Sequence, residues 1–137
     1  AAIAGLPSFF LVASILTVNN TCDIEGDRAA GRLTLSILLG RGAGEALVYL
    51  LGAGAFAAAA FSALAGVVPR GGAAAALVSL VFAAREYRKM HGRGFGHSTK
   101  GPNMRSVLRV FGFFSLCYAA AFAAALAAGH LEGRFYG

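Results

Sequence analysis

The stretch from residue 110 to residue 129 reads VFGFFSLCYAAAFAAALAAG and contains no charged side chain. As a helix, about 20 residues rise about 30 Å, which is the thickness of the hydrocarbon core of a bilayer. The segments 1–22 and 46–68 are likewise free of charge, and the uncharged segment 71–84 is shorter. Their alanine runs favour helix, and no alternation of apolar and polar residues appears, so these segments predict membrane-spanning helices rather than strands.

The composition of the whole chain leads to the same fold class. Of 137 residues, 58% are hydrophobic and 13% are charged, and the mean hydropathy is +0.68. A soluble domain of this size would need more polar side chains to cover its surface. We therefore predict an all-α, polytopic membrane helix bundle that forms part of one domain over residues 1–137. About four transmembrane helices are expected, at about 3–20, 45–67, 73–90 and 105–128.

The basic residues predict how the bundle is oriented. Of the 12 Lys and Arg residues, all except Arg70 and Arg134 flank the predicted spans on one side, between the first and second spans and between the third and fourth. Loops rich in Lys and Arg stay in the cytoplasm, so we expect both of these connections there. The net charge of +6 is then explained by topology and by contact with anionic lipid headgroups. Nucleic-acid binding is not expected, because no soluble basic face with stacking aromatics is present.

Polar residues gather at the end of the first span, in the segment 19–28, NNTCDIEGDR. If the helix continues through this segment, Asn19, Asp23 and Asp27 form one column with steps of about 6 Å. Two carboxylates at that spacing attract a cation, and Mg²⁺ prefers such oxygen ligands and bridges them to phosphates. Arg28 and Arg32 follow and could hold diphosphate oxygens. An ordinary helix end with a surface pair between Asp23 and Arg28 is the alternative.

A longer pattern contains this acidic segment. The run Asn19-Asn20-x-x-Asp23-x-x-x-Asp27-Arg28-x-x-Gly31-x-x-Thr34-Leu35-x-x-x-Leu39-Gly40 resembles the second aspartate-rich motif of the intramembrane aromatic prenyltransferases, the UbiA superfamily. Within that family it looks most like the 1,4-dihydroxy-2-naphthoate polyprenyltransferases of menaquinone biosynthesis. The resemblance is dense over about 22 residues, and elsewhere it is mainly one of hydropathy.

The resemblance implies a fold of nine spans around a central cavity, of which the present chain would supply spans six to nine. It also implies two facing aspartate motifs that hold Mg²⁺ and a polyprenyl diphosphate, and transfer of the polyprenyl group to an aromatic quinone precursor. We expect such a protein in the bacterial inner (plasma) membrane, with the aspartate motif on the cytoplasmic side. The implied roles are metal ligation for Asn19, Asp23 and Asp27, with the two aspartates catalytic, and shaping of the motif for Asn20, Gly31 and Thr34. Diphosphate contact is expected for Arg28 and Arg32 from their position just beyond the aspartates, and for Lys100 from its place in the loop that would face the motif.

The sequence departs from the family pattern in three ways. No Asn-Asp-x-x-Asp motif occurs in the 137 residues, Leu33 stands where the family has a basic residue, and Gly26 replaces a larger side chain. Arg32 could substitute for the basic residue, and Gly26 is expected to loosen the helix between the aspartates. We expect the first five spans and the partner motif to lie N-terminal to residue 1, so that this chain is inactive alone.

Two alternatives stay open at this point. The first keeps the family and changes the aromatic acceptor to 4-hydroxybenzoate, homogentisate, chlorophyllide or haem. The second is a non-enzymatic four-span membrane protein, such as a small transporter or an assembly factor.

The histidines and the glycine-rich segment 91–102 offer no further site. His91, His97 and His130 have no Cys or carboxylate at ligand spacing, so we expect them to be loop residues. The glycine pattern follows no strand and opens no nucleotide-binding unit, so it predicts a mobile loop.

Overall fold

The computed structural model describes residues 2–69 and 71–135, and the side chains of residues 3–69 and 71–129. Four long helices form its body: α1 (Ala2–Cys22), α4 (Arg41–Leu64), α5 (Gly71–Arg93) and α6 (Lys100–Phe135). Three short helices connect them: α2 (Ile24–Ala29), α3 (Leu35–Leu39) and the 3₁₀ helix η1 (His97–Thr99). No strand occurs in the described ranges. The predicted all-α bundle is confirmed.

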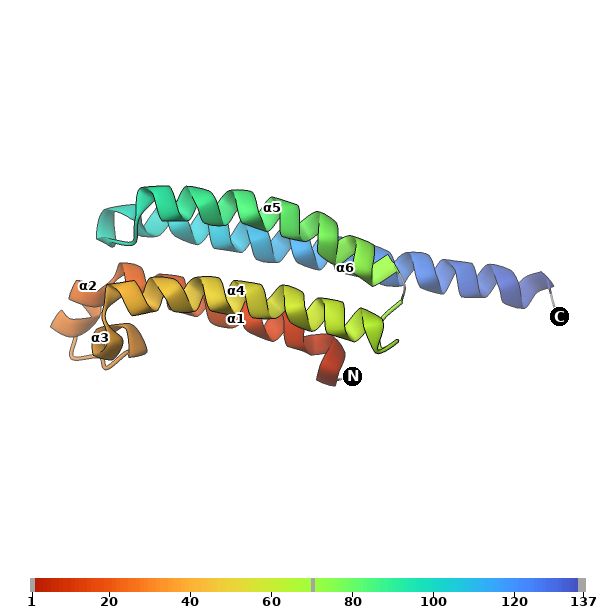
Figure 1. The fold of residues 1–137 in the computed structure, drawn as a ribbon, viewed down its shortest axis with the longest axis horizontal. Coiled ribbons are helices and arrows are strands. Elements are labelled where there is room, and N and C mark those ends of the chain that lie inside the picture. Colours follow the sequence, from red (N-terminus) through yellow and green to blue (C-terminus); the bar gives the residue numbers. More distant parts are fainter. Residues whose placement is uncertain (1, 70, 136–137) are drawn as a thin grey trace.

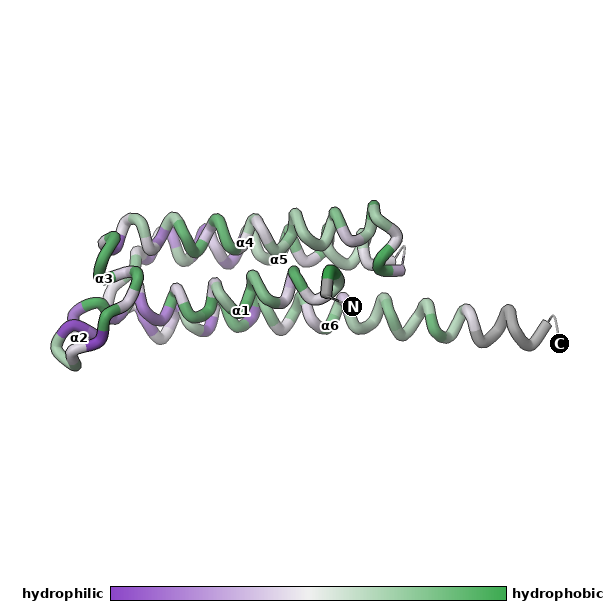
Figure 2. The backbone as a smooth tube through the Cα atoms, turned by 90° about the horizontal axis from the view of Figure 1, so that it is seen from below, coloured by the Kyte–Doolittle hydropathy of each residue, from purple (hydrophilic) through white to green (hydrophobic). Residues whose placement is uncertain are grey.

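The long helices lie side by side in two pairs (Figure 1). Helix α1 packs along α4 and α5 packs along α6, while contacts of α1 with α6 and of α4 with α5 join the pairs. Helices α2 and α3 lie at the same end of the bundle as the turn between α5 and α6. Figure 2 shows hydrophilic residues gathered at that end. The two connections predicted to be cytoplasmic therefore share one end of the molecule. Of the two basic residues predicted on the other side, Arg70 and the side chain of Arg134 lie outside the described residues.

Three of the four predicted spans correspond to helices with the length and hydropathy of a membrane span. Three helical segments are long and apolar enough to cross a membrane, Ile3–Cys22, Arg41–Leu64 and His97–Gly129. They correspond to the predicted spans 3–20, 45–67 and 105–128. The predicted span 73–90 is the helix α5, but it is not among these segments, because its second half carries a run of charged side chains. The chain thus has four long helices and three candidate spans in its described part.

Small residues allow the two helix pairs to approach each other closely. A Cβ atom added at Gly52 of α4 would lie 2.6 Å from the Tyr87 hydroxyl of α5, so only glycine fits this contact. Gly54, two residues further along, faces the ring of Phe10 on α1, within the α1–α4 pair. Such positions are where helices contact in membranes, since lipid supplies no hydrophobic drive for their association. The apolar core continues on either side of this contact, with Phe56 against Phe114 at a centroid distance of 5.9 Å.

Candidate functional site

The helix through the acidic segment is interrupted at Asp23. Helix α1 ends at Cys22 and α2 begins at Ile24, and Asp23 between them has φ −122° and ψ 30°. The predicted single column of Asn19, Asp23 and Asp27 along one continuous helix is therefore wrong. The Asp23 carboxylate lies over Gly26, where an added Cβ would be 2.5 Å from Asp23 Oδ1. The glycine that departs from the family pattern thus makes room for the aspartate.

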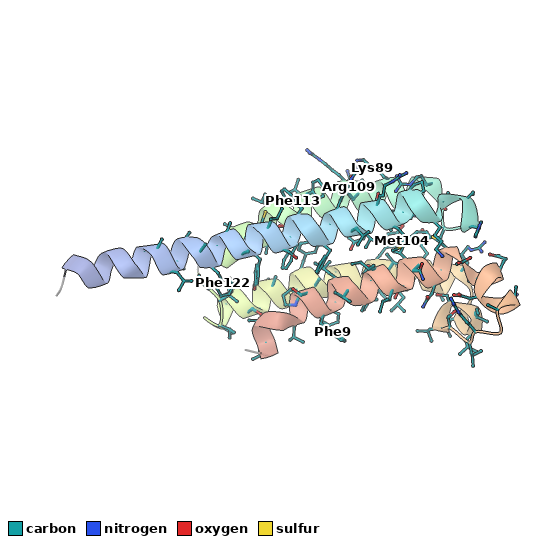
Figure 3. All side chains as sticks on the ribbon, turned by 180° about the vertical axis from the view of Figure 1, so that it is seen from behind. Phe9, Lys89, Met104, Arg109, Phe113 and Phe122 are labelled. Carbon is teal, nitrogen blue, oxygen red and sulfur yellow. The ribbon has the colours of Figure 1, made fainter. Side chains whose placement is uncertain are left out.

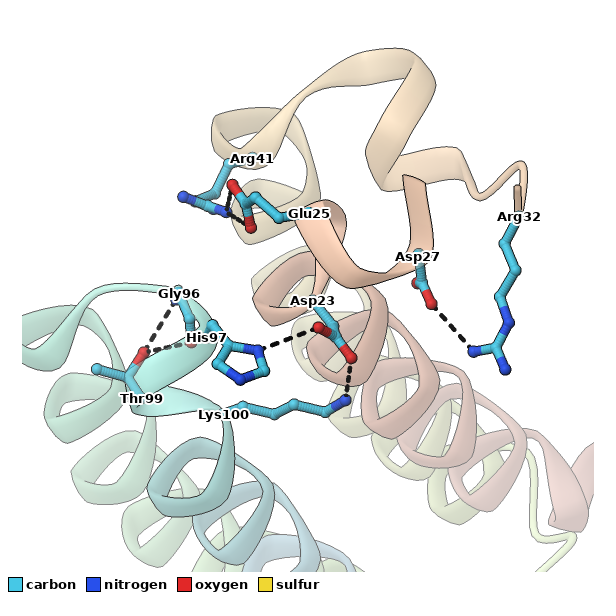
Figure 4. Close-up of polar contacts among 9 residues, drawn as sticks. All are labelled: Asp23, Glu25, Asp27, Arg32, Arg41, Gly96, His97, Thr99 and Lys100. Carbon is cyan, nitrogen blue, oxygen red and sulfur yellow. Dashed lines mark hydrogen bonds and ion pairs between the residues drawn. The ribbon is translucent and has the colours of Figure 1, made fainter. Parts of the chain in front are cut away.

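The Asp23 carboxylate reaches across to the start of α6 (Figure 4). Its Oδ2 accepts a hydrogen bond from Lys100 Nζ at 2.5 Å, and its Oδ1 lies 3.2 Å from His97 Nδ1. The hydrogen bond from Lys100, with a smaller one from His97, holds the pKa of Asp23 below its ordinary value. Asp23 is therefore ionised at neutral pH and already placed to attract cations.

The glycine-rich segment forms an ordered turn that presents His97 and Lys100. Gly94 adopts φ 70°, and its carbonyl accepts hydrogen bonds from Thr99 Oγ1 and Asn103 Nδ2, both at 2.9 Å. Arg93 Nε donates to Asn103 Oδ1 at 3.0 Å. The expected loop thus contains a short 3₁₀ helix, and the turn before it is fixed by hydrogen bonds that involve the side chains of Arg93, Thr99 and Asn103.

The second aspartate of the motif has a different environment. Asp27 is 3% exposed, and its Oδ1 accepts a hydrogen bond from Arg32 Nη1 at 3.1 Å. Its Oδ2 is buried and has no hydrogen-bond partner among the described residues. The neighbouring Leu33 is largely exposed. Arg32, rather than the residue at position 33, thus supplies the positive charge beside the motif.

The other predicted residues are distributed around these two carboxylates. Gly31 has φ 69°, and the Thr34 hydroxyl accepts a hydrogen bond from the first turn of α3. Asn20 lines a small cavity of about 40 Å³ between α1, α3 and α4. Asn19 is half-buried near the end of α1, and Arg28 is exposed in the last turn of α2.

The structure therefore assembles part of the predicted set and adds a residue to it. Lys100 joins Asp23, and Arg32 joins Asp27, whereas Asn20 lies against α3 and α4. His97 was not predicted as a site residue, because its contact with Asp23 depends on the packing of α6 against α1. The only signal for His97 in the sequence was its position three residues before Lys100, in a segment between Gly96 and Gly101.

The two other histidines add nothing to this set. His91 pairs with Glu45, with 2.9 Å between His91 Nδ1 and Glu45 Oε1. The side chain of His130 lies outside the described residues.

The chemistry of these donors fits a hard divalent cation. Carboxylate and carboxamide oxygens are the ligands that Mg²⁺ accepts, and the buried Oδ2 of Asp27 has no hydrogen-bond partner among the described residues. Within the described ranges, no group of three or more His, Cys, Asp or Glu side chains is placed to hold a metal by itself. A cation at this motif would need water or substrate phosphates to complete its coordination, which is common for Mg²⁺.

The structure is a membrane helix bundle with two aspartates and their basic partners at one end. These features define a class of integral membrane protein that can bind an anionic group at the bilayer surface. The UbiA prenyltransferase family matches residues 1–94, well over half of the chain, and the chain belongs to this family. No match was found among curated proteins or among solved structures. Membership supports a prenyltransferase activity in a membrane, with prenyl diphosphate and aromatic substrates. The family is generally dependent on Mg²⁺.

Proposed function

We propose that this protein moves a polyprenyl group from its diphosphate to 1,4-dihydroxy-2-naphthoate, with Asp23 and Asp27 in the catalytic centre. The observation that carries the proposal is the pairing of each aspartate with a basic side chain at the same end of the bundle. Lys100 neutralises Asp23 and Arg32 neutralises Asp27. Carboxylates for a metal and cations for a diphosphate are thus close together where the membrane ends.

The acidic side chains are assigned to the metal. Asp23 and Asp27 would hold Mg²⁺, with the carboxamide oxygen of Asn19 as a neutral ligand. When bound, Mg²⁺ would neutralise the diphosphate and make it a better leaving group.

The basic side chains are assigned to the diphosphate. Arg32 and Lys100 are the partners of the two aspartates, and Arg28 is exposed on the same short segment. Arginine binds phosphate oxygens in a bidentate way, and lysine binds them as a point charge. These three residues would hold the diphosphate before and after it leaves. Asn20, Gly31 and Thr34 keep the turn between α2 and α3 in place.

The proposed reaction balances without a redox partner. The allylic C–O bond of the polyprenyl diphosphate breaks, and a C–C bond forms at the ring carbon that bears the carboxylate. Carbon dioxide and diphosphate leave. The helix bundle favours this chemistry, because an apolar environment keeps water from the allylic cation.

The proposal includes the location and the extent of the site. Asp23 and Asp27 would face the cytoplasm from a bacterial inner membrane, since the basic residues gather at their end of the bundle. Residues 1–137 contain one acidic motif where the family resemblance implies two. We therefore assign this chain to the C-terminal part of one prenyltransferase domain, and expect it to be inactive without the partner motif.

The test is prenyl transfer by the protein together with the segment that carries the partner motif. Asp23→Asn and Asp27→Asn should each lower the rate at least about 100-fold, because removal of an electrostatic group that acts in the transition state has effects of that size. Glu25→Gln is the matched control. Glu25 lies in α2, as Asp27 does. Its two carboxylate oxygens accept hydrogen bonds from Arg41 Nη2 at 2.6 Å and 2.8 Å, away from both aspartates. It should retain most of the activity.

The acceptor is tested in the same assay. 1,4-Dihydroxy-2-naphthoate should react, with release of carbon dioxide, faster than 4-hydroxybenzoate, homogentisate, chlorophyllide or haem. Faster transfer to one of the other four would reject the naphthoate and leave the aspartate assignment intact. Full activity of both aspartate variants would reject the assignment of the site itself.

A further inference from the structure

A second charged region lies on the outer side of the α5–α6 pair, apart from the aspartates. Five cationic side chains contribute to it: Arg85, Arg88 and Lys89 from α5, and Arg105 and Arg109 from α6. All five are exposed. Their spacings of three and four residues place them on one face of each helix. Figure 3 shows Lys89 and Arg109 on the side of this pair that is turned away from α1 and α4.

The positive charge of this region is largely uncompensated. One carboxylate, Glu86, lies among the five cations. Its Oε1 accepts a hydrogen bond from Lys89 Nζ at 2.6 Å, and Arg109 is close enough to influence it electrostatically. Glu86 is 3% exposed, and its Oε2 has no hydrogen-bond partner among the described residues. A single buried carboxylate cannot balance five cations, so the surface keeps a strong net positive charge.

The depth of these cations is set by the sequence of α6. Arg109 immediately precedes the uncharged segment 110–129, whose about 30 Å of helix fills the hydrocarbon core. Arg85 likewise ends the uncharged part of α5. One helical turn deeper, Phe82 and Phe113 stack across the two helices with a centroid distance of 4.5 Å. Guanidinium groups at the boundary and an aromatic pair just inside match the phosphate and the upper acyl chains of a lipid.

We propose that this face is a binding site for one anionic phospholipid, whose phosphate bridges Arg85 of α5 and Arg109 of α6. The charge complementarity selects an anionic headgroup over a zwitterionic one, and the exposed side chain of Leu116 continues the apolar surface for the acyl chains. The site is distinct from the aspartate motif. Arg109 lies about 13 Å further along α6 than Lys100, and Lys100 turns toward α1 instead.

The absence of tryptophan from the sequence permits a direct test. Leu116→Trp places a single fluorophore on the exposed surface of α6, two helical turns deeper than Arg109 and beside the expected acyl chains. The protein is reconstituted in phosphatidylcholine bilayers that contain brominated phosphatidylglycerol, and then in bilayers with the bromine on phosphatidylcholine. Bromine quenches tryptophan at contact, so the two series give the relative affinity of the two lipids. We expect a preference of about fivefold for phosphatidylglycerol, which decreases with added salt.

Charge variants locate the preference. Arg85→Gln with Arg109→Gln should reduce it to near onefold, whereas Arg41→Gln, which removes a cation that pairs with Glu25 and lies outside this face, should leave it unchanged. Arg88→Gln with Arg105→Gln touches neither bridging residue and should reduce the preference partly, which provides a second series if the first pair impairs folding. Retained helical circular dichroism checks each variant.

Three outcomes would overturn the proposal. Equal quenching by the two brominated lipids would show that the face does not select anionic lipid. Loss of the preference on addition of inorganic phosphate at equal concentration would show a site for soluble anions. Little quenching by either lipid would show that another polypeptide segment covers the face.

Discussion

The α1–α4 pair and the α5–α6 pair have long helices of similar kind but carry their charges at different depths. In the first pair, α1 has no charge through Cys22, and α4 has charges only at Arg41 and Glu45, near its start. In the second pair, charges extend inward from the same end as far as Arg85 and Arg109.

The two pairs are correspondingly held together by different contacts. The α1–α4 contact uses small residues and two weak polar links, from Ser14 Oγ to the Val48 carbonyl and from Ser62 Oγ to the Ile3 carbonyl, both at 3.3 Å. The α5–α6 contact includes a polar network in which Arg93 Nη2 donates to Ser106 Oγ at 2.7 Å. The difference shows that a helix with charged flanks, such as α5, can join a membrane bundle when its neighbour supplies polar partners. Hydropathy alone identifies α1, α4 and α6 but not α5.

The largest expected effect concerns whether α5 crosses the membrane despite its charges. Ala65→Cys follows α4, and Ser98→Cys lies between α5 and α6; both positions are exposed. If α5 spans, the two cysteines lie on opposite sides, and a membrane-impermeant maleimide should label only Ala65→Cys in intact spheroplasts. Lysis should make Ser98→Cys fully reactive. Both variants also carry Cys117→Ala, and the remaining native cysteine, Cys22, is buried. Labelling of both positions in intact spheroplasts would place α5 outside the bilayer.

The next effect concerns the joint between the two pairs. Gly52→Val should destabilise the protein by about 1–3 kcal/mol, because the new side chain overlaps Tyr87 in a packed contact. Gly42→Val is the matched control, since a Cβ there meets nothing within 4 Å. Thermal unfolding in detergent measures both. Equal melting temperatures for the two variants would mean that the α4–α5 contact is looser than described.

The fold could be predicted from the sequence because uncharged length and alanine content act locally. The helix ends could be predicted less well. Arg41 begins α4 four residues before the predicted span, and its pairing with Glu25 is a contact with another segment. At the other end, Gly66 adopts φ 66° and α4 stops at Leu64, three residues before the predicted end.

Apart from Lys100, the site could be predicted only as far as its pattern is continuous in sequence. The segment from Asn19 to Gly40 was sufficient to indicate the aspartates and the family. The break at Asp23 was not predicted, because it accompanies contacts of that carboxylate with Lys100 and His97, about 75 residues away. Residues that meet only through the packing of α1 against α6 leave no local pattern.

A smaller effect compares one carboxylate from each pair. The Glu86 side chain is 4% exposed and the Glu45 side chain 26%. Glu86→Gln should cost about 1–2 kcal/mol, because it removes a buried charged acceptor beside Lys89. Glu45→Gln should cost less than about 0.5 kcal/mol, because its contact with His91 is largely solvated. Chemical unfolding of the two variants gives the comparison. A greater loss of stability for Glu45→Gln than for Glu86→Gln would contradict the assignment of the polar network to the α5–α6 pair.

The smallest effect concerns the ion pair between Asp23 and Lys100, which connects the α1–α4 helix pair to the α5–α6 helix pair. The hydrogen bond from Lys100 lowers the pKa of Asp23. The stabilisation of the folded state by this ion pair is therefore complete above the ordinary carboxyl pKa of 3.8. It is lost as the pH falls through the lowered value, where the folded state must also take up the proton. The difference in melting temperature between the parent protein and Asp23→Asn should therefore shrink as the pH falls below about 4. The comparison at each pH cancels the contribution of Glu25, whose pKa is also lowered. Because Asp23 is close to solvent, 0.5 M salt should reduce the difference at pH 7 as well. A difference that grows as the pH falls below about 4 would mean that Asp23 is held in its neutral form, and Lys100 would then not be its partner.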